Sequence, residues 1–205
     1  MKLVLVRHGK TLSNKEHRYL GKTDEGLSEE GIIDLQNGKA MGIYPDVDYL
    51  FSSPMKRCLE TASIIYPQKD PIIILDWQEM DFGEFEGKNH LDLNGDKRYR
   101  EWIDSNGTLP FPGGESREDF FMRCKKGLYE MYEHIISEEN YGENTVHICD
   151  QMTIGLIVHG GTIMSLLSNL YGGDYYDYHI SNGKGYVCNL AYKDGKISFN
   201  SLKEL

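Results

Sequence analysis

The 205-residue sequence contains little cysteine and little proline, and each shortage excludes a class of protein. The 4 cysteines form no C-x-x-C pair, which argues against a redox motif or a zinc ribbon. Buried reduced thiols are the expected state of all of them: Cys58, Cys124, Cys149 and Cys188. With 6 prolines and 40% hydrophobic residues, the composition is that of a globular protein rather than a disordered or fibrous one.

Positive charge is also scarce. The chain has 22 Lys and Arg residues against 32 Asp and Glu residues, which gives a formal net charge of -10. The resulting field repels nucleic acid and anionic membranes, so neither is expected as a partner. An anionic substrate would need a locally positive site, which makes the placement of the few arginines informative.

Long apolar runs are missing. No stretch approaches the ~18 apolar residues of a membrane span. The first apolar run, Leu3 to Val6, stops at Arg7 and is too short for the core of a signal peptide. We therefore expect a cytoplasmic protein.

Strand patterns alternate with helix patterns along the chain. Short runs rich in Val, Ile and Leu have the pattern of strands buried on both faces of a parallel sheet: 2–6, 49–53, 71–75 and 154–158. Capping residues or helical spacing predict the helices: 28–41, 54–66, 116–135 and 162–170. Near the end of the chain, Lys193-Asp194-Gly195 predicts a hairpin between strands at 185–191 and 197–202.

This order of elements predicts an α/β fold, a three-layer α/β/α sandwich with a mainly parallel central sheet. We expect a single domain over residues 1–205. The segment 83–114 is rich in Gly, Asp, Asn and Lys and interrupts the alternation, so it is expected to leave the sheet and cover the site. The sequence does not predict how the stretch 144–153 pairs with the strands of the sheet.

Ligands of such sheets bind just outside the carboxyl ends of the strands. Two of the expected strands end in His-Gly, at His8-Gly9 and His159-Gly160, and a third ends shortly before Arg57. We expect these ends to meet in one crevice.

The residue types gathered there suit phosphate chemistry. Arg7 and Arg57 can bind phosphate oxygens at any accessible pH, and positive side chains can take the place of Mg²⁺. A neutral histidine whose first ring nitrogen is fixed by the backbone can attack phosphorus with the second, which makes His8 the candidate nucleophile. A carboxyl group of raised pKa would protonate the leaving alkoxide and later activate water.

Five blocks of sequence together resemble the histidine phosphatase superfamily, which includes cofactor-dependent phosphoglycerate mutases, fructose bisphosphatases and α-ribazole phosphatases. The resemblance spans residues 1 to about 191 and implies a phosphoglycerate mutase-like fold. The blocks are Val4–Thr11 with Asn14, Arg18, Gly21, Asp24, Leu27 and Gly31; Ser52–Ala62; Glu79–Gly87; Pro112–Ser116 with Phe120 and Arg123; and Val158–Gly161.

The resemblance also implies roles. Arg57 and His159 would be phosphate ligands, and Glu79 would be the general acid. The nearby acids Asp81, Glu84 and Glu86 leave that last assignment open.

Four further residues are expected to bind substrate. Asn14 and Thr11 would contact phosphate, although both could equally stabilise their loop. Lys10 replaces the small or acidic residue usual after Arg-His-Gly in the family and adds charge at the rim. Gly160 would lie beside the phosphate.

No metal or other cofactor is expected. His147 and Cys149 lie two residues apart, and two ligands without a second pair fall short of a zinc site. An oligomer is possible but not indicated by the sequence.

The leading interpretation is a phosphomonoesterase acting on a small phosphorylated metabolite, with α-ribazole phosphate and sugar phosphates as candidates. The short chain favours it over a mutase, because mutases of this family carry insertions and a tail that shield phosphohistidine from water. A cofactor-dependent phosphoglycerate mutase is the alternative. A non-catalytic anion-binding module is a third hypothesis, although it would not need both a nucleophile and a proton donor.

Overall fold

The computed structural model describes residues 1–138 and 151–205, which form a six-stranded sheet. The strands lie in the order β3-β2-β4-β1-β5-β6. Strands β1 to β4 run parallel, whereas β5 is antiparallel to β1, and β6 to β5. The mainly parallel sheet expected from the sequence is confirmed, with an antiparallel pair at one edge. The strands are β1 (Lys2–Arg7), β2 (Tyr49–Ser52), β3 (Ile72–Ile73), β4 (Thr153–Val158), β5 (Gly185–Lys193) and β6 (Lys196–Glu204).

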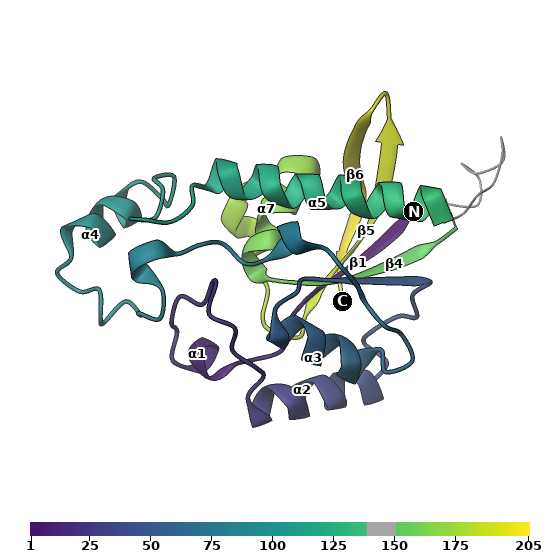
Figure 1. Ribbon diagram of the computed structural model, residues 1–205, viewed down its shortest axis with the longest axis horizontal. Coiled ribbons are helices and arrows are strands. Elements are labelled where there is room, and N and C mark those ends of the chain that lie inside the picture. The colour runs from purple at the N-terminus through teal and green to yellow at the C-terminus, as the bar shows by residue number, and fades with distance from the viewer. Residues whose placement is uncertain (139–150) are drawn as a thin grey trace.

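Helices cover both faces of the sheet (Figure 1). One face carries α2 (Glu29–Ala40) and α3 (Lys56–Ile65), and the other carries α5 (Arg117–Glu138) and α7 (Gly160–Leu170). The three-layer sandwich is therefore confirmed. The short helix α4 (Lys97–Asp104) projects from one end, away from these layers. The remaining elements are α1 (Leu12–Lys15) and the 3₁₀ turns η1 (Leu75–Trp77), η2 (Gly83–Phe85) and η3 (Tyr175–Tyr178).

Strand β1 is buried on both faces, as its continuous apolar run predicts. Successive side chains of a strand point to opposite faces. Leu3 and Leu5 join the core that includes α5 and α7, whereas Val4 and Val6 join the core formed with α2 and α3. All four are 0% exposed, and truncating one of the leucines to alanine would cost about 2–5 kcal/mol. The strand that carries the His-Gly pair is thus held rigidly between both layers.

The expected third buried strand is shorter and more exposed than its sequence suggests. Only Ile72–Ile73 pair, and they pair with β2 at the edge of the sheet. Ile73 is 37% exposed and Leu75 is 68% exposed. The prediction of a buried strand over 71–75 was wrong because an apolar run does not distinguish a central strand from an edge. The chain turns instead into η1, which leads directly to Glu79.

Within the described residues, no helix is both long and apolar enough to cross a membrane.

The predicted Asp-Gly hairpin is confirmed, and it places one wall of the site. Asp194 and Gly195 both have positive φ, 51° and 75°, as a two-residue turn that matches the twist of its strands requires. Because β5 runs antiparallel to β1, its first residue Gly185 lies opposite Val6. The loop before β5 therefore passes beside the carboxyl end of β1.

Candidate active site

His8 lies immediately after β1 and is 3% exposed. Its Nδ1 atom lies 2.8 Å from the Gly9 carbonyl oxygen. A carbonyl oxygen only accepts, so Nδ1 carries the proton and donates. The other ring nitrogen, Nε2, is left with its lone pair.

The imidazole of His8 stays uncharged at neutral pH. Burial lowers the pKa of His8 well below its ordinary value, and the charges of Arg57 and Arg7 lower it further. The hydrogen bond to Gly9 opposes this shift without reversing it. The ring is therefore held in the neutral form, with one defined tautomer.

His159 packs behind His8, with ring centroids 5.2 Å apart. Its Nδ1 atom accepts from Arg57 Nε at 3.3 Å, because a guanidinium can only donate. Its Nε2 atom must then carry the proton and donate to Ser53 Oγ at 2.7 Å. Burial, followed by the charge of Arg57, lowers the pKa of His159 well below the ordinary value, so this ring is neutral too.

Arg57 is 0% exposed and is held by three protein acceptors. Besides His159, it donates to the carbonyl oxygens of Thr23 and Gly21, each at 2.9 Å. A guanidinium has five N–H donors, so two remain for an anion.

Arg7 has more unused donors than Arg57. It donates from one terminal nitrogen to the Ile180 carbonyl oxygen at 2.6 Å. Its buried Nε has no hydrogen-bond partner in the described part of the chain. A Cβ on Gly160 would lie 3.2 Å from Arg7 Cζ and Nε, so glycine leaves the guanidinium its room. An unpartnered buried donor of this kind suits an anionic ligand.

Glu79 lies across the site from these cations, 8% exposed. Its carboxyl oxygens accept from the backbone N–H groups of Met80 at 2.9 Å and Gly161 at 3.3 Å. Burial raises the pKa of Glu79, although both backbone bonds and the charges of Arg57 and Arg7 lower it in part. A Cβ on Gly161 would come within 2.4 Å of Glu79 Oε1, so this glycine leaves room for the carboxyl group.

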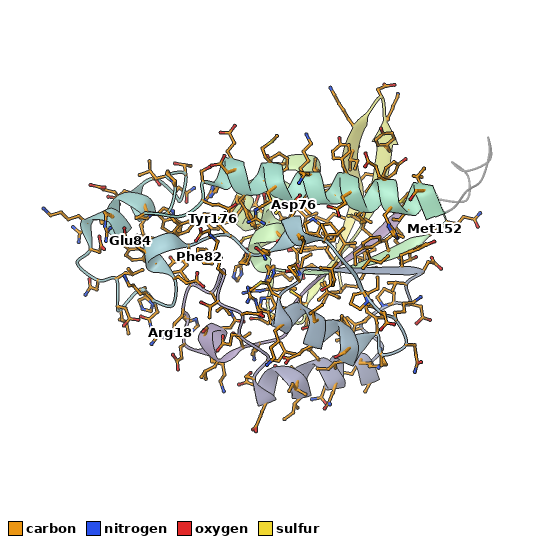
Figure 2. The ribbon with its side chains drawn as sticks, viewed as in Figure 1. Arg18, Asp76, Phe82, Glu84, Met152 and Tyr176 are labelled. Atoms are coloured by element: carbon orange, nitrogen blue, oxygen red, sulfur yellow. The ribbon has the colours of Figure 1, made fainter. Side chains whose placement is uncertain are left out.

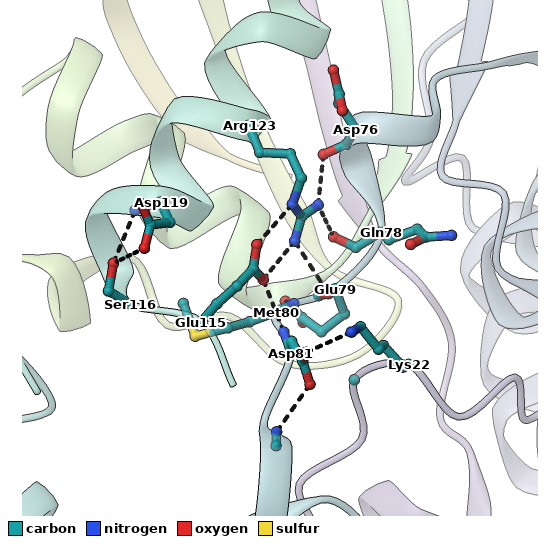
Figure 3. A network of polar contacts seen from close by, with 12 residues as sticks. Lys22, Asp76, Gln78, Glu79, Met80, Asp81, Glu115, Ser116, Asp119 and Arg123 are labelled. Atoms are coloured by element: carbon teal, nitrogen blue, oxygen red, sulfur yellow. Dashed lines mark hydrogen bonds and ion pairs between the residues drawn. The ribbon is translucent and has the colours of Figure 1, made fainter. Parts of the chain in front are cut away.

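The backbone around Glu79 is fixed by an arginine from α5 (Figure 3). Arg123 donates to the carbonyl oxygens of Asp76 at 2.7 Å, Gln78 at 2.9 Å and Glu79 at 3.4 Å. It also forms a bidentate pair with Glu115, with distances of 2.9 and 2.8 Å. Glu115 Oε2 in turn accepts from the backbone N–H of Asp81. One ion pair therefore holds the segment that presents Glu79 on both sides.

The groups of the site open into one cavity of about 230 Å³. Arg7, His8, Glu79 and Gly160 lie on its wall. Aromatic side chains form much of the rest: Tyr19, Phe82, Trp102, Phe111, Tyr175 and Tyr176. Figure 2 labels Phe82 and Tyr176, which lie at the end of the molecule from which α4 projects.

Comparison with known proteins identifies the family of this site. Residues 3–204 match the family model of the histidine phosphatase superfamily, branch 1. The chain belongs to the histidine phosphatase superfamily. The resemblance found in the sequence blocks is thus confirmed over nearly the whole chain.

Relatives in this superfamily include both mutases and phosphatases. The 2,3-bisphosphoglycerate-dependent phosphoglycerate mutase 2 of Gloeobacter violaceus is 31% identical, over 82% of this chain and 74% of its own. A protein of Hydrogenobacter thermophilus provisionally described as phosphoserine phosphatase 2 is 26% identical, over 83% of this chain and 79% of its own. The structure of phosphoglycerate mutase from Thermus thermophilus superposes with a TM-score of 0.69 at 28% identity, covering 98% of each chain. The expected phosphoglycerate mutase-like fold is confirmed.

Within this histidine phosphatase fold, the five predicted catalytic residues lie close together, but not all of them border the cavity. Arg7, His8 and Glu79 border the cavity, whereas Arg57 and His159 lie behind His8 and do not. Arg7, His8 and His159 come from the carboxyl ends of β1 and β4, Arg57 comes from the first turn of α3, which follows β2, and Glu79 comes from the segment after η1.

Of the acidic residues in the third block, only Glu79 borders the cavity. Asp81 is paired with Lys22, and Glu84 is paired with Arg98. Both oxygens of the Glu86 carboxyl group accept from backbone N–H groups. The geometry therefore favours Glu79 over its acidic neighbours as the candidate general acid.

The expected substrate-binding residues divide into two groups. Asn14 and Gly160 border the cavity. Thr11 is 0% exposed, and its hydroxyl accepts from Asn14 N at 3.2 Å to cap α1, so it acts on the loop. Lys10 forms ion pairs with Glu30 at 2.7 Å and Asp34 at 3.1 Å, and borders only an outer hollow next to the cavity.

Sequence reasoning missed Asn182, which lies in the loop before β5. Its amide donates to the His8 carbonyl oxygen at 3.1 Å and to Asn14 Oδ1 at 3.0 Å. The antiparallel hairpin would have brought this loop to the end of β1, which is the signal that could have found it.

No group of three or more His, Cys, Asp and Glu side chains that could hold a metal ion occurs in residues 1–138 and 151–205. His147 and Cys149, which were weighed as ligands, lie outside the described residues. Cys58 Sγ lies 3.6 Å from His159 Nε2, but burial raises the pKa of this thiol to about 12. It stays protonated and does not compete as a nucleophile.

The two buried neutral histidines predict a loss of stability in mild acid. Both have pKa values below the unfolded value, so below about pH 6.5 the unfolded chain binds protons that the folded state does not. Each should lower the free energy of unfolding by about 1 kcal/mol between pH 7 and pH 5.5. Glu79, whose pKa is raised, works in the opposite direction.

Denaturant unfolding of wild type and of His8→Gln across this range checks the prediction. The variant should show a shallower decline, by roughly one histidine's share. An identical decline in both proteins would show that the pKa of His8 is the same in the folded and unfolded states, and a steeper decline in the variant would show that folding raises it.

Proposed function

We propose that this histidine phosphatase superfamily member is a metal-independent phosphomonoesterase that works through a phosphohistidine at His8. The observation that carries the proposal is a neutral His8, with Nε2 unprotonated, beside the partly unpartnered Arg7 and the high-pKa carboxyl group of Glu79. Nucleophile, anion receptor and proton donor all border one cavity. A small phosphorylated metabolite is the proposed substrate.

In the first step His8 Nε2 attacks phosphorus, a P–N bond forms and the ester P–O bond breaks. The leaving alkoxide takes the proton of Glu79, which becomes a carboxylate. Positive charge from Arg7 and Arg57 balances the phosphoryl oxygens as the transition state forms. Nδ1 keeps its proton and donates it to the Gly9 carbonyl oxygen, so the phosphorylated ring is an imidazolium cation that this carbonyl group stabilises.

In the second step water attacks phosphorus and the P–N bond breaks. The Glu79 carboxylate accepts a proton from that water, which returns both residues to their starting states. A raised pKa serves both steps, because the group must be protonated first and basic afterwards.

Arg57 and His159 support the reaction from behind His8. The two remaining donors of Arg57 are proposed to reach the phosphoryl oxygens once a substrate is bound. His159 links Arg57 to Ser53, and so holds the guanidinium in place.

A phosphoglycerate mutase is the second candidate. It is favoured by the Gloeobacter violaceus relative, the mutase that is 31% identical. A mutase would return the phosphoryl group of His8 to a second hydroxyl rather than to water. Dependence on a bisphosphorylated primer, without net release of phosphate, would identify it.

The anion-binding module is the weaker alternative. A binder gains nothing from a carboxyl group of raised pKa facing its anion. We also propose a cytoplasmic location, because Cys58, Cys124 and Cys188 are free thiols, which suits a reducing compartment.

Removal of the nucleophile should abolish turnover and leave the fold intact. His8→Ala is expected to lower phosphate release from phosphomonoesters by about 10⁴-fold or more, and to eliminate acid-labile phosphoprotein. Released phosphate, trapped phosphoprotein and circular dichroism, all in the presence of EDTA, are the measurements. Turnover retained in a folded His8→Ala protein would exclude the phosphohistidine route.

Removal of the proton donor should depend on the leaving group. Glu79→Gln should slow an alkyl phosphate by roughly 10²-fold or more, but p-nitrophenyl phosphate much less, because nitrophenolate leaves without a proton. The ratio of the two kcat/KM values is the measurement. Glu84→Gln, an exposed acid of the same block, is the control and should keep the wild-type ratio. Equal losses for both esters in Glu79→Gln would remove its role as the acid.

Arg123 is expected to act as a positioning residue for Glu79. Arg123→Lys cannot bind Glu115 through two bonds and the three carbonyl groups at once. It should reduce kcat for alkyl phosphates by about tenfold, with a smaller effect on p-nitrophenyl phosphate, because only the protonation step is displaced. The control is Arg98→Lys, because Arg98 is an exposed arginine that also forms an ion pair with a glutamate. A uniform loss for both esters would indicate a purely structural role.

A further inference from the structure

The cavity beside His8 is bordered by aromatic rings from three separate segments. The Tyr19 ring packs against Phe82 at 5.2 Å, Phe111 at 5.9 Å and Trp102 at 6.1 Å between centroids. Phe111 also contacts Phe82 at 5.0 Å and Trp102 at 4.8 Å. These rings form one continuous wall, which we call the aromatic wall.

Besides Arg7, the cavity is bordered by Arg18 and Arg117, and both already contact other side chains of the described part of the protein. Arg18 already binds Glu16 at 2.6 Å and Asp92 at 2.7 Å. The guanidinium of Arg117 lies 4.3 Å from the centre of the Tyr175 ring and 4.8 Å from that of Tyr176.

Arg117 therefore extends the aromatic wall as a flat surface. One of its terminal nitrogens donates to the Asn106 carbonyl oxygen at 2.6 Å, which fixes the plane of the group. Gly107 has φ of +67°, and a Cβ there would lie 2.7 Å from the Tyr176 hydroxyl and 2.8 Å from Arg117. This glycine lets the excursion pack closely against η3.

Two of the four rings of the aromatic wall, Phe82 and Phe111, carry no hydrogen-bonding group, so a polar alcohol that lies against them finds few partners. Arg7, His8 and Glu79 belong to the phosphoryl group and its leaving oxygen. Each hydroxyl buried against the wall without a hydrogen-bond partner would weaken binding. An apolar cavity of about 150 Å³ holds a benzene molecule, so about 230 Å³ has room for one ring together with the phosphoryl group beside Arg7 and His8.

We propose that the enzyme selects phosphomonoesters whose alcohol carries a flat, uncharged aromatic or heteroaromatic ring a few bonds from the ester oxygen. The ring would lie against the aromatic wall and Arg117, while the phosphoryl group meets Arg7 and His8. This inference rests on the proposed phosphomonoesterase activity and names its substrate class. The proposal predicts poor turnover of small polyhydroxy and carboxylate esters such as glycerol phosphate and 3-phosphoglycerate.

The first experiment compares primary alkyl esters that differ in the ring. We expect kcat/KM for 2-phenylethyl phosphate to exceed that for ethyl phosphate, glycerol 1-phosphate and 3-phosphoglycerate by about tenfold or more. Tyr176→Ala and Phe82→Leu should each reduce the ratio of phenylethyl to ethyl phosphate by about threefold or more. Tyr192→Ala is the matched control, 47% exposed on β5 and outside the cavity, and should keep the wild-type ratio.

The second experiment separates the substrate class from the proposed activity. Calorimetry measures the binding of 3-phenylpropylphosphonate and propylphosphonate, which cannot be hydrolysed. Tighter binding of the ring compound, weakened by Tyr176→Ala and not by Tyr192→Ala, supports the class even if no ester is turned over.

Three outcomes would overturn either the proposed substrate class or the proposed phosphomonoesterase activity. Equal turnover and equal binding with and without the ring would overturn the substrate class and leave the phosphomonoesterase standing. A preference for 3-phosphoglycerate would also overturn it, and would show that the cavity accepts a carboxylate beside the phosphoryl group. Absence of phosphate release from every ester would overturn the proposed activity alone.

Discussion

The hydrogen bond from His8 Nδ1 to the Gly9 carbonyl oxygen is the contact on which the chemistry of the site depends. It fixes the tautomer and leaves Nε2 free to attack. The peptide between His8 and Gly9, which precedes this acceptor, is itself held, because Gly9 N donates to Thr61 Oγ1 at 2.9 Å and Asn182 donates to the His8 carbonyl oxygen at 3.1 Å. A freely turning imidazole would lose this orientation, and with it most of the advantage of a preformed site.

Burial then gives each group the protonation state that it needs. Burial, and after it the charges of Arg57 and Arg7, keep His8 neutral, whereas the same charges lower the pKa of the nearby Glu79. Desolvation outweighs them at the carboxyl group and raises its pKa, whereas at the imidazole it acts in the same direction as the arginines. One dry environment thus lowers the pKa of the imidazole and raises the pKa of the adjacent carboxyl group. An open, hydrated site could not separate the two groups in this way.

The positions of the candidate catalytic residues were predictable from the sequence, whereas the cavity wall was not. Strand ends are marked by local apolar runs, so His8, Arg57 and His159 could be placed at one edge of the sheet from their positions alone. The contact between Tyr19 and Phe111 joins segments that share no periodic pattern. The pair of Glu115 and Arg123 likewise depends on where α5 begins relative to the chain after η1. Such contacts are set by tertiary packing, which motif spacing does not encode.

The aromatic residues of the segment 83–114 limit how the shape of the cavity can change. The segment 83–114 has no sheet strand of its own, so its aromatic residues are also its core: Phe85, Trp102 and Phe111 are at most 9% exposed. Trp102 and Phe111 therefore belong both to the cavity wall and to the packing that holds the excursion in place. A substitution that reshapes the pocket alters the local stability as well. Only partly exposed positions at its rim, such as Tyr176, can vary with little effect on folding.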